Sequence, residues 1–312
     1  MDFVGKRWWF LLVSALFILP GLVSLAIPPA LRLGIEFTGG STLDVEFREP
    51  VLESRVREQL AAAGRPEAQV QVSGPTSFFV RTAALGGPNV AVGDVSGREE
   101  LRRALEVLAP VVRFDVSSVS GVVARDTVRN AFLAVAAASV AILAYITWAF
   151  RRVPRSFRFG TAAVIALVHD VLVVLGTFSI LGKLVGLEVN AMFITGVLTV
   201  IGYSVHDTIV VFDRIRENVA RAPGIPLGAA VNTSIMETFG RSLNTTLTSL
   251  FAVFALLLLG GESIRGFVLV LLVGLLTGTY SSICNASQIL VIWETGEARD
   301  MLRRLFRARS RA

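Results

Sequence analysis

The sequence predicts a mostly α-helical membrane protein with six transmembrane helices and a small external α+β domain between the first and second of them. Apolar residues make up 53% of the 312 residues and charged residues 17%, whereas soluble domains average about 45–50% and about 25%. Six apolar runs are long enough to cross a bilayer, which requires roughly 20 helical residues. A polar segment long enough for a small domain separates the first two runs.

The six apolar runs define the predicted transmembrane helices. They occupy residues 8–27, 131–150, 160–182, 190–212, 243–260 and 266–293. Four of them contain no charged residue, and the other two contain one His-Asp pair each. The chain therefore divides into four predicted parts. These are a cytoplasmic N-terminus with the first helix (1–27), an extracytoplasmic domain (28–130), helices two to six (131–293) and a basic cytoplasmic tail (294–312).

The first run has some features of a signal peptide, because Lys6 and Arg7 precede it and "SLA" at 24–26 offers a small-x-small cleavage site. However, the run is 20 residues long, and the apolar region of a signal peptide has roughly 7–15. We therefore expect the segment to be retained as a membrane anchor, with removal as the alternative.

The distribution of lysine and arginine predicts the orientation. Sixteen of these residues lie in 1–7, 151–159, 213–242 and 294–312, whereas 183–189 and 261–265 together hold two. Because cytoplasmic loops are enriched in positive residues, both termini are expected in the cytoplasm. The net charge of +6 then needs no nucleic-acid partner. We interpret the tail as a topology signal that also attracts anionic lipid headgroups. Contact with RNA or the ribosome is an alternative without support in the sequence.

The external segment has the pattern of four strands and two helices. Residues 41–47 alternate in polarity as a half-buried strand does, and Gly64 ends a stretch with helical spacing. Ser96 is a candidate N-cap for the second helix. The strands are expected at 41–47, on either side of the turn 74–76, and at 111–119, and the helices at 51–63 and 97–108. The order β-α-β-β-α-β is that of the split βαβ or ferredoxin-like domain.

The chemistry of this segment favours a binding or mechanical role over catalysis. It holds 12 arginines, no lysine and 13 acidic residues, and neither histidine nor cysteine. We expect no metal site and no cofactor, and we interpret 86–94 as a mobile loop. The single cysteine of the chain, Cys284, lies in an apolar run, so it is expected to be a packing residue rather than half of a disulfide. The protein is therefore not expected to be an enzyme.

The two His-Asp pairs are the candidate functional residues. The only histidines of the chain, His169 and His206, are followed directly by Asp170 and Asp207 within the third and fourth predicted helices. An aspartate at the centre of a membrane helix costs roughly 2.5–3.5 kcal/mol on insertion scales, so such residues usually belong to ion or substrate pathways. Arg241 begins the fifth helix, and its long side chain could reach an aspartate on a neighbouring helix.

An aspartate that gains and loses a proton carries charge through the membrane at low cost. If a change of shape moves Arg241 towards or away from Asp207, protonation and conformation become coupled. The histidines would then act as relays or orienting donors. The alternative is that each His-Asp pair is only a polar contact that assembles the bundle. Adjacent residues on a helix point about 100° apart, so both members of one pair cannot face the same small site squarely.

Two other membrane segments are interpreted as structural. Gly274, Gly278 and Ser282 recur every four residues, which favours close helix packing. Segment 226–239 is expected to form an amphipathic helix along the cytoplasmic surface.

Several long motifs resemble the SecD/SecF family. "LGIEFTGGS" (33–41) is similar to the glycine-rich signature that begins the external domain of the family. "IGYSVHDTIVVFDRIREN" (201–218), "NTSIMETFGRSLNTTLTSL" (232–250) and "LLLGGESIRGFVLVLLVGLLTGTYSSI" (257–283) follow in the family's order and spacing. The resemblance covers nearly the whole chain and implies half of an RND-type transporter in the bacterial cytoplasmic membrane.

The resemblance also implies a function and partners. Members assist the Sec translocase and are thought to use proton flow, or sodium flow in some members, to pull secreted chains outward. The implied partners are SecD, the SecYEG channel, YajC, YidC, membrane lipid and the unfolded secretory polypeptide. The family's ion route maps to Asp207 and Arg241, and the third-helix pair maps to His169 and Asp170. Many members carry asparagine where this chain has His206, so the resemblance fixes no role for that residue and slightly favours protons.

Two alternative functions are considered beside this one. The first is one half of an RND-type small-molecule transporter, which the single external domain and the export motifs disfavour. The second is a scaffold that stabilises the translocon without ion flow.

Overall fold

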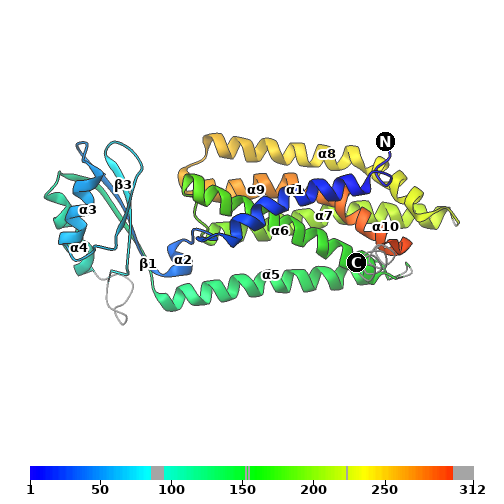
Figure 1. The fold of residues 1–312 in the computed structure, drawn as a ribbon, viewed down its shortest axis with the longest axis horizontal. Helices are drawn as coiled ribbons and strands as arrows, with labels where there is room; N and C mark the ends of the chain where they lie inside the picture. The colour runs from blue at the N-terminus through cyan, green and yellow to red at the C-terminus, as the bar shows by residue number, and fades with distance from the viewer. Residues whose placement is uncertain (86–94, 152, 154, 223, 298–312) are drawn as a thin grey trace, which may run out of the picture. The chain divides into compact units, whose positions relative to one another are not determined.

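The computed structural model describes residues 1–85, 95–151, 153, 155–222 and 224–297 (Figure 1). Its residues group into two compact units. The sheet domain comprises Leu33–Phe132, and the helix bundle comprises Met1–Arg32 and the chain from Leu133 onward. The loop 86–94 and the arginines of the tail from residue 299 lie outside the described residues.

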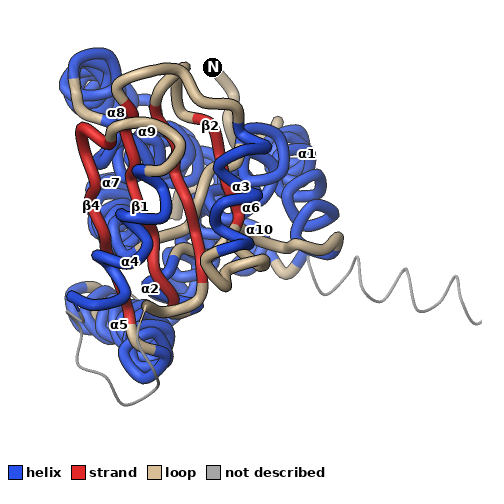
Figure 2. Tube along the Cα trace, turned by 90° about the vertical axis from the view of Figure 1, so that its left-hand side faces the viewer, coloured by secondary structure: helices blue, strands red, loops and turns tan. Residues whose placement is uncertain are grey.

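The sheet domain contains one antiparallel four-stranded sheet in the order β2-β3-β1-β4. In the register of the two central strands, Leu43 of β1 faces Val80 of β3. Two helices of the domain, α3 and α4, pack on one face of the sheet (Figure 2). The elements are α2 (Ile35–Thr38), β1 (Gly40–Phe47), α3 (Glu53–Ala62), β2 (Gln69–Val72), β3 (Ser77–Thr82), α4 (Val95–Glu106) and β4 (Val111–Val119).

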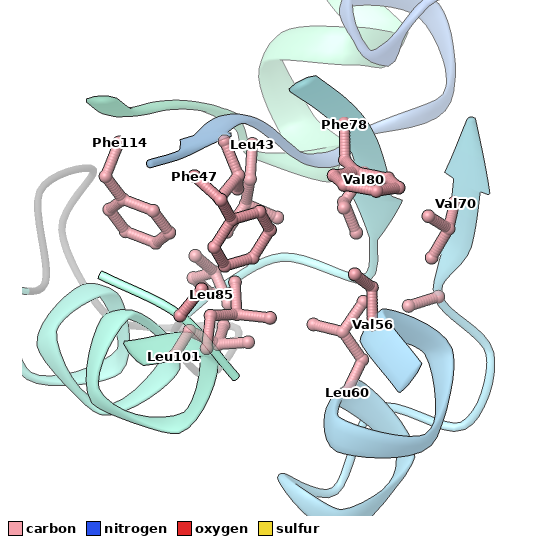
Figure 3. Close-up of a cluster of buried hydrophobic side chains, with 14 residues drawn as sticks. Leu43, Phe47, Val56, Leu60, Val70, Phe78, Val80, Leu85, Leu101 and Phe114 are labelled. Atoms are coloured by element: carbon pink, nitrogen blue, oxygen red, sulfur yellow. The ribbon is translucent and has the colours of Figure 1, made fainter. Parts of the chain in front are cut away.

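Alternation along the strands produces the core between the sheet and these helices. Leu43, Val45 and Phe47 of β1 are buried, while the residues between them are only half-buried. They belong to one buried cluster with Val56 and Leu60 of α3, and Figure 3 shows Leu43 and Phe47 with these two side chains. The expected half-buried strand at 41–47 is therefore confirmed, since burying one face of a sheet requires apolar residues at every second position.

The predicted helix ends in this domain need small corrections. Helix α3 begins at Glu53 rather than at 51, and Gly64 follows its end with φ +78°, a conformation that favours glycine. Helix α4 begins at Val95, so Ser96 lies within the first turn and is not the N-cap.

Six helices of the described residues are long and apolar enough to cross a membrane, and all of them lie in the bundle except the first turns of α5, which belong to the sheet domain. Most extend beyond the predicted apolar runs, because hydropathy stops at charged residues while the helical backbone continues. In the sixth, a π-helical segment, η1, separates α9 from α10. The elements are α1 (Arg7–Ala26), α5 (Gly121–Ala149), α6 (Phe157–Val185), α7 (Ala191–Arg221), α8 (Leu227–Leu259), α9 (Glu262–Ser281), η1 (Ser282–Ala286) and α10 (Ser287–Thr295).

Segment 226–239 is not a separate surface helix, which corrects the sequence-based expectation. From Leu227 it is the first part of the continuous helix α8. Its stripe of buried residues includes Val231, Ser234 and Ile235, and Ser234 accepts a hydrogen bond from Asn218 of α7. The apolar stripe of this segment therefore packs within the bundle.

Small residues allow the closest helix contacts. A Cβ atom added to Gly274 would lie 2.1 Å from the side chain of Val200, and one added to Gly278 would lie 3.1 Å from Ser204. Ser282 continues this face, with its hydroxyl 2.8 Å from that of Thr208. The prediction of close packing along Gly274, Gly278 and Ser282 is therefore confirmed, and the partner is α7.

Different polar contacts join the helices at the two ends of the bundle. At one end, Arg7 forms a bidentate ion pair with Glu297. At the same end, the backbone nitrogen of Phe3 donates a hydrogen bond to the side chain of Asn232, near the start of α8. The start of α1, the start of α8 and the end of α10 therefore lie together. At the other end, Lys183 donates to the carbonyl of Ser24.

Candidate functional site

Asp207 lies on α7 and is buried in the bundle, with an exposed fraction of 6%. Its Oδ1 accepts a hydrogen bond of 2.6 Å from the Ser242 hydroxyl of α8. Its Oδ2 is buried and has no hydrogen-bond partner. An ionised carboxylate can accept about four hydrogen bonds, so this environment satisfies a charged Asp207 poorly.

Hydroxyl groups extend from this site between α7, α8 and α9. Thr246 lies one turn beyond Ser242 on α8 and donates to the Ser242 carbonyl. Its hydroxyl lies 2.6 Å from that of Thr279 on α9 and 3.1 Å from that of Tyr203 on α7. The packed hydroxyls next to the Asp207 site can thus exchange donor and acceptor roles with one another.

Asp170 of α6 forms a second buried site, with an exposed fraction of 1%. Its Oδ2 accepts hydrogen bonds from Ser204 of α7, at 2.6 Å, and from Ser281 of α9, at 2.7 Å. The Nδ1 atom of His169 lies 3.0 Å from Oδ1. Asp170 therefore joins three helices and, unlike Asp207, has partners for both oxygens.

The two aspartates lie on opposite sides of the contact between α7 and α9. Ser204 binds Asp170 through its hydroxyl, and its carbonyl accepts from both Thr208 and Ser282. Thr208 directly follows Asp207 in the chain. Ser282 is also the first residue of the π-helical segment, a feature frequently found at functional sites.

Arg241, whose side chain could reach an aspartate according to the sequence, forms no hydrogen bond or ion pair with Asp207 in this structure. Its side chain is exposed, and the neighbouring residue Ser242 occupies the position beside the carboxylate. Arg241 instead lines a cleft of about 470 Å³ between α7 and α8. Because one residue on a helix corresponds to about 100°, Arg241 and Ser242 point in different directions.

The two histidines have different environments. His169 is buried, contacts Asp170 and has an Nε2 atom without a partner. His206 is exposed, whereas its neighbour Asp207 is buried. The expected difference in direction between adjacent residues is therefore seen at 206 and 207. At 169 and 170 the histidine ring turns back to its own neighbour.

Sequence reasoning missed the hydroxyl partners of both aspartates. The signal was present in "SLNTTLTSL" (242–250) and "GTYSSICNAS" (278–287), which place many hydroxyls within apolar helices. Within the residues that the structure describes, no group of three or more His, Cys, Asp or Glu side chains could hold a metal ion. The arrangement places two buried, protonatable carboxyls beside hydroxyls that can donate and accept hydrogen bonds.

Comparison with known proteins identifies relatives over the whole chain. Residues 102–296 match the model of the C-terminal region of SecD/SecF protein-export membrane proteins, and residues 29–51 match the SecD/SecF GG motif. The chain is 44% identical to the protein translocase subunit SecF of Thermobaculum terrenum, over 97% of each chain. It is 41% identical to the SecF subunit of Anaerolinea thermophila, also over 97% of each chain.

Longer fused relatives match as well. The chain is 35% identical to the SecDF subunit of Bacillus subtilis, covering 95% of this chain and 38% of that protein. The crystal structure of SecDF, a translocon-associated membrane protein from Thermus thermophilus, matches with a TM-score of 0.78 at 33% identity. That match covers 95% of this chain and 39% of the other. A SecDF structure in the super-membrane-facing form matches with a TM-score of 0.64 at 33% identity, over 100% and 40% of the two chains.

Proposed function

Because the chain belongs to the SecD/SecF family of protein-export membrane proteins, we propose that it couples proton flow to the outward movement of secreted polypeptides. In this proposal the bundle carries the proton and the sheet domain moves in response. Family membership and six apolar helices make it a multi-pass membrane protein of protein export. The coupling itself rests on the site described above.

The observation that carries the proposal is the unsatisfied oxygen of Asp207. A buried carboxyl with one hydrogen bond and one orphan oxygen is suited to the protonated form. When the proton leaves, the charge requires a cation or water beside it. The two protonation states therefore favour different surroundings, which is the requirement for a group that couples proton transfer to a change of shape.

In this proposal Arg241 is the cation that stabilises the deprotonated form of Asp207. It adjoins Ser242, the present partner of Asp207, and has no bond to the carboxylate in this structure. A rotation of α8 by about one residue, or about 100°, would exchange the serine for the guanidinium. Loss of the proton would favour that exchange, and proton uptake would reverse it. Moving one charge across the membrane yields about 2.3 kcal/mol per 100 mV, enough to bias such a two-state element.

Asp170 and His169 receive a supporting role in the same proposal. Both oxygens of Asp170 have hydrogen-bond partners, on α7, on α9 and at His169 of its own helix. We therefore expect this site to hold the three helices together rather than to change its contacts. The hydroxyls of Ser204, Thr208 and Ser282 link it to the residue after Asp207. A change at Asp207 would thus reach α6 through α7. We assign no role to His206, which is exposed.

The location and partners follow from the family and from charge. We place the protein in the bacterial cytoplasmic membrane with both termini in the cytoplasm, since one end of the bundle collects the arginine-rich loops. The sheet domain is then extracytoplasmic. Its strand order β2-β3-β1-β4, with helices after β1 and β3, supports a ferredoxin-like classification, and the family supports an RND-type membrane half.

The partners are proposed on the same basis. SecD is the first, because some relatives carry both parts in one SecDF chain. The SecYEG channel, YajC and YidC are further proposed partners, and the emerging secretory polypeptide is the proposed substrate. Sodium remains the alternative ion, and a scaffold without ion flow remains the alternative function, favoured only by the fully bonded state of Asp170.

Replacing Asp207 tests the proposal. In inside-out vesicles that contain the chain with SecD and the translocon, Asp207→Asn should abolish the dependence of export on the proton gradient while the complex still assembles. Asp126→Asn is the control, because Asp126 is an exposed carboxyl on α5 that does not line the cleft between α7 and α8. Gradient-dependent export that survives in Asp207→Asn would refute the coupling role and favour the scaffold.

A further inference from the structure

Polar contacts join the antiparallel helices α7 and α8 in a regular series. Tyr203 contacts Thr246 at 3.1 Å, and one turn further Asp207 contacts Ser242 at 2.6 Å. Beyond a gap of about two turns, Arg214 contacts Glu237 at 2.6 Å and Asn218 contacts Ser234 at 3.0 Å. In each pair the residue number rises on α7 as it falls on α8, as antiparallel packing requires.

The gap in this series is the cleft of about 470 Å³. Val210 of α7 and Thr238 and Arg241 of α8 lie in its lining. Val210 follows Asp207 by three residues, and Thr238 precedes Ser242 by four, so both lie one turn from the Asp207–Ser242 bond. The lining of the cleft therefore comes within about one helical turn of the buried carboxyl, although Asp207 itself does not line it.

An ion pair lies across the outer part of the cleft. Arg214 and Glu237, which both line it, retain exposed side-chain fractions of 31% and 37%, whereas Asp207 is buried. Asn218 also donates to Glu237, at 2.8 Å. Among the described residues of α8, Glu237 is thus the one that accepts hydrogen bonds from two side chains of α7, those of Arg214 and Asn218.

We propose that this cleft is the route by which protons pass between Asp207 and the end of the bundle that carries the start of α1, and that the Arg214–Glu237 ion pair is its gate. The inference rests on the proposed function of Asp207, and it adds an access path and two positioning residues. A buried carboxyl with an unpartnered oxygen needs contact with water to exchange its proton, and the cleft ends one turn away. Partly exposed ion pairs contribute little to stability, so such a gate can open and close readily.

Glu217 offers a matched control for the gate. It also binds Arg214, at 2.6 Å, and it also lines the cleft. However, Glu217 and Arg214 are both on α7, so this pair does not cross between the helices. Neutralising Glu237 should therefore open the cleft, and neutralising Glu217 should not.

Thiol labelling measures the opening directly. The test uses inside-out vesicles containing the chain with SecD, the substitutions Cys284→Ala and Val210→Cys, and a charged methanethiosulfonate that does not cross membranes. Adding Glu237→Gln should raise the labelling rate at position 210 about fivefold, the change in open fraction that corresponds to ~1 kcal/mol. Adding Glu217→Gln should change it less than about twofold.

The native cysteine controls for general loosening of the bundle. Cys284 is buried in η1 and does not line the cleft. In Glu237→Gln with Cys284 retained and Val210 unchanged, Cys284 should stay unlabelled. Equal labelling of position 210 with and without Glu237→Gln would overturn the gate. So would equal acceleration by Glu217→Gln, or exposure of Cys284.

A reversible lock separates the gate from the proposed function. In the Cys284→Ala background, Arg214→Cys with Glu237→Cys is treated with a short bis-methanethiosulfonate cross-linker. Gradient-dependent export should fall on cross-linking and return with reductant. If export continues in the locked protein while Asp207→Asn abolishes its gradient dependence, the gate is wrong and the coupling role stands. If Asp207→Asn leaves export unchanged, the coupling role fails irrespective of the labelling rates.

Discussion

The interiors of the two units differ in the polar side chains that they bury. The sheet domain buries an apolar cluster that includes Leu43, Phe47 and Phe78. Among the buried polar side chains of the described residues, only those of Ser41 and Thr82 lie in the sheet domain. The others, including Asp170 and Asp207, lie in the bundle. Water drives apolar groups together, whereas lipid gives helices no such gain, and small and polar residues determine their packing.

This difference is the reason that the proposed coupling is assigned to the bundle. A proton-binding carboxyl needs a place where its charge is costly and its neighbours are few. The bundle provides this at Asp207, with hydroxyls within reach and one oxygen free. Several described carboxylates of the sheet domain, in contrast, are exposed and form ion pairs at the surface, as Glu53 does with Arg57. Three substitutions test how far the contrast holds.

The largest effect on stability is expected from Phe47→Ala in the sheet domain. Phe47 is 2% exposed and packs edge-on against Phe78 at a centroid distance of 5.7 Å. Removing a buried phenyl ring costs about 3–5 kcal/mol, so the domain should unfold at a much lower temperature in the full-length protein. Protease protection of residues 33–132 during a thermal ramp measures this. Val72→Ala, at an exposed strand position, should change little, and equal losses in both variants would contradict the assigned core.

A smaller effect is expected from Ser281→Ala in the bundle. This removes one of the two hydroxyls that donate to Oδ2 of Asp170 and leaves Ser204 in place. Polar contacts between membrane helices average ~0.6 kcal/mol with a maximum of ~1.7, so thermal unfolding in detergent should shift only slightly. Ser204→Ala combined with Ser281→Ala leaves that oxygen without a donor, and should cost about 1–3 kcal/mol more.

Ser139→Ala is the control for this series, because the Ser139 hydroxyl bonds only to the carbonyl of Val135 in its own helix. It should be neutral. If Ser281→Ala alone proved as damaging as Phe47→Ala, the two interiors would depend equally on single contacts, and the contrast between them would be lost.

Much of the architecture could be predicted because it depends on local pattern. Alternation identified the strand that contains Leu43, and apolar length identified all six membrane helices. The cost of burying charge identified Asp170 and Asp207. What local pattern cannot supply is the rotation of one helix about its axis relative to another. The sequence indicated that Arg241 could reach Asp207, and the structure has its neighbour Ser242 at the carboxylate, a difference of one residue and about 100°.

The same limit applies to the helix ends and to the hydroxyl partners. Hydropathy ends a span at its first charges, so α8 was expected to start near residue 243 and instead starts at Leu227. Its early turns carry Ser234 and Glu237, which bind α7. Ser204 and Ser281 are far apart in the chain and meet at Asp170 only because α6, α7 and α9 pack together. No spacing within one helix encodes that meeting.

The smallest effect concerns Glu67, an exposed carboxylate of the sheet domain. A hydrogen bond from its own backbone lowers the pKa of Glu67 below the ordinary value of 4.5, and the Thr82 hydroxyl, 3.1 Å away, acts in the same direction. A carboxyl whose pKa is lower in the folded state stabilises that state above its unfolded pKa, and loses the contribution as pH falls through the folded value. The advantage of the native residue over Glu67→Gln should therefore be present at neutral pH and fade as pH falls below 4.5.

Thermal unfolding of the full-length protein and Glu67→Gln between neutral and acidic pH measures that advantage, with Glu58→Gln, at an exposed position of α3, as the control. The difference between native protein and Glu67→Gln should be a small shift that shrinks towards acid, while Glu58→Gln follows the native curve throughout. If the difference in unfolding temperature between the native protein and Glu67→Gln increased as the pH fell, the folded state would favour the protonated form of Glu67. The sheet domain would then favour the protonated form of a carboxyl, as the bundle is proposed to do at Asp207. The two units would in that case no longer differ in how they stabilise their acidic side chains.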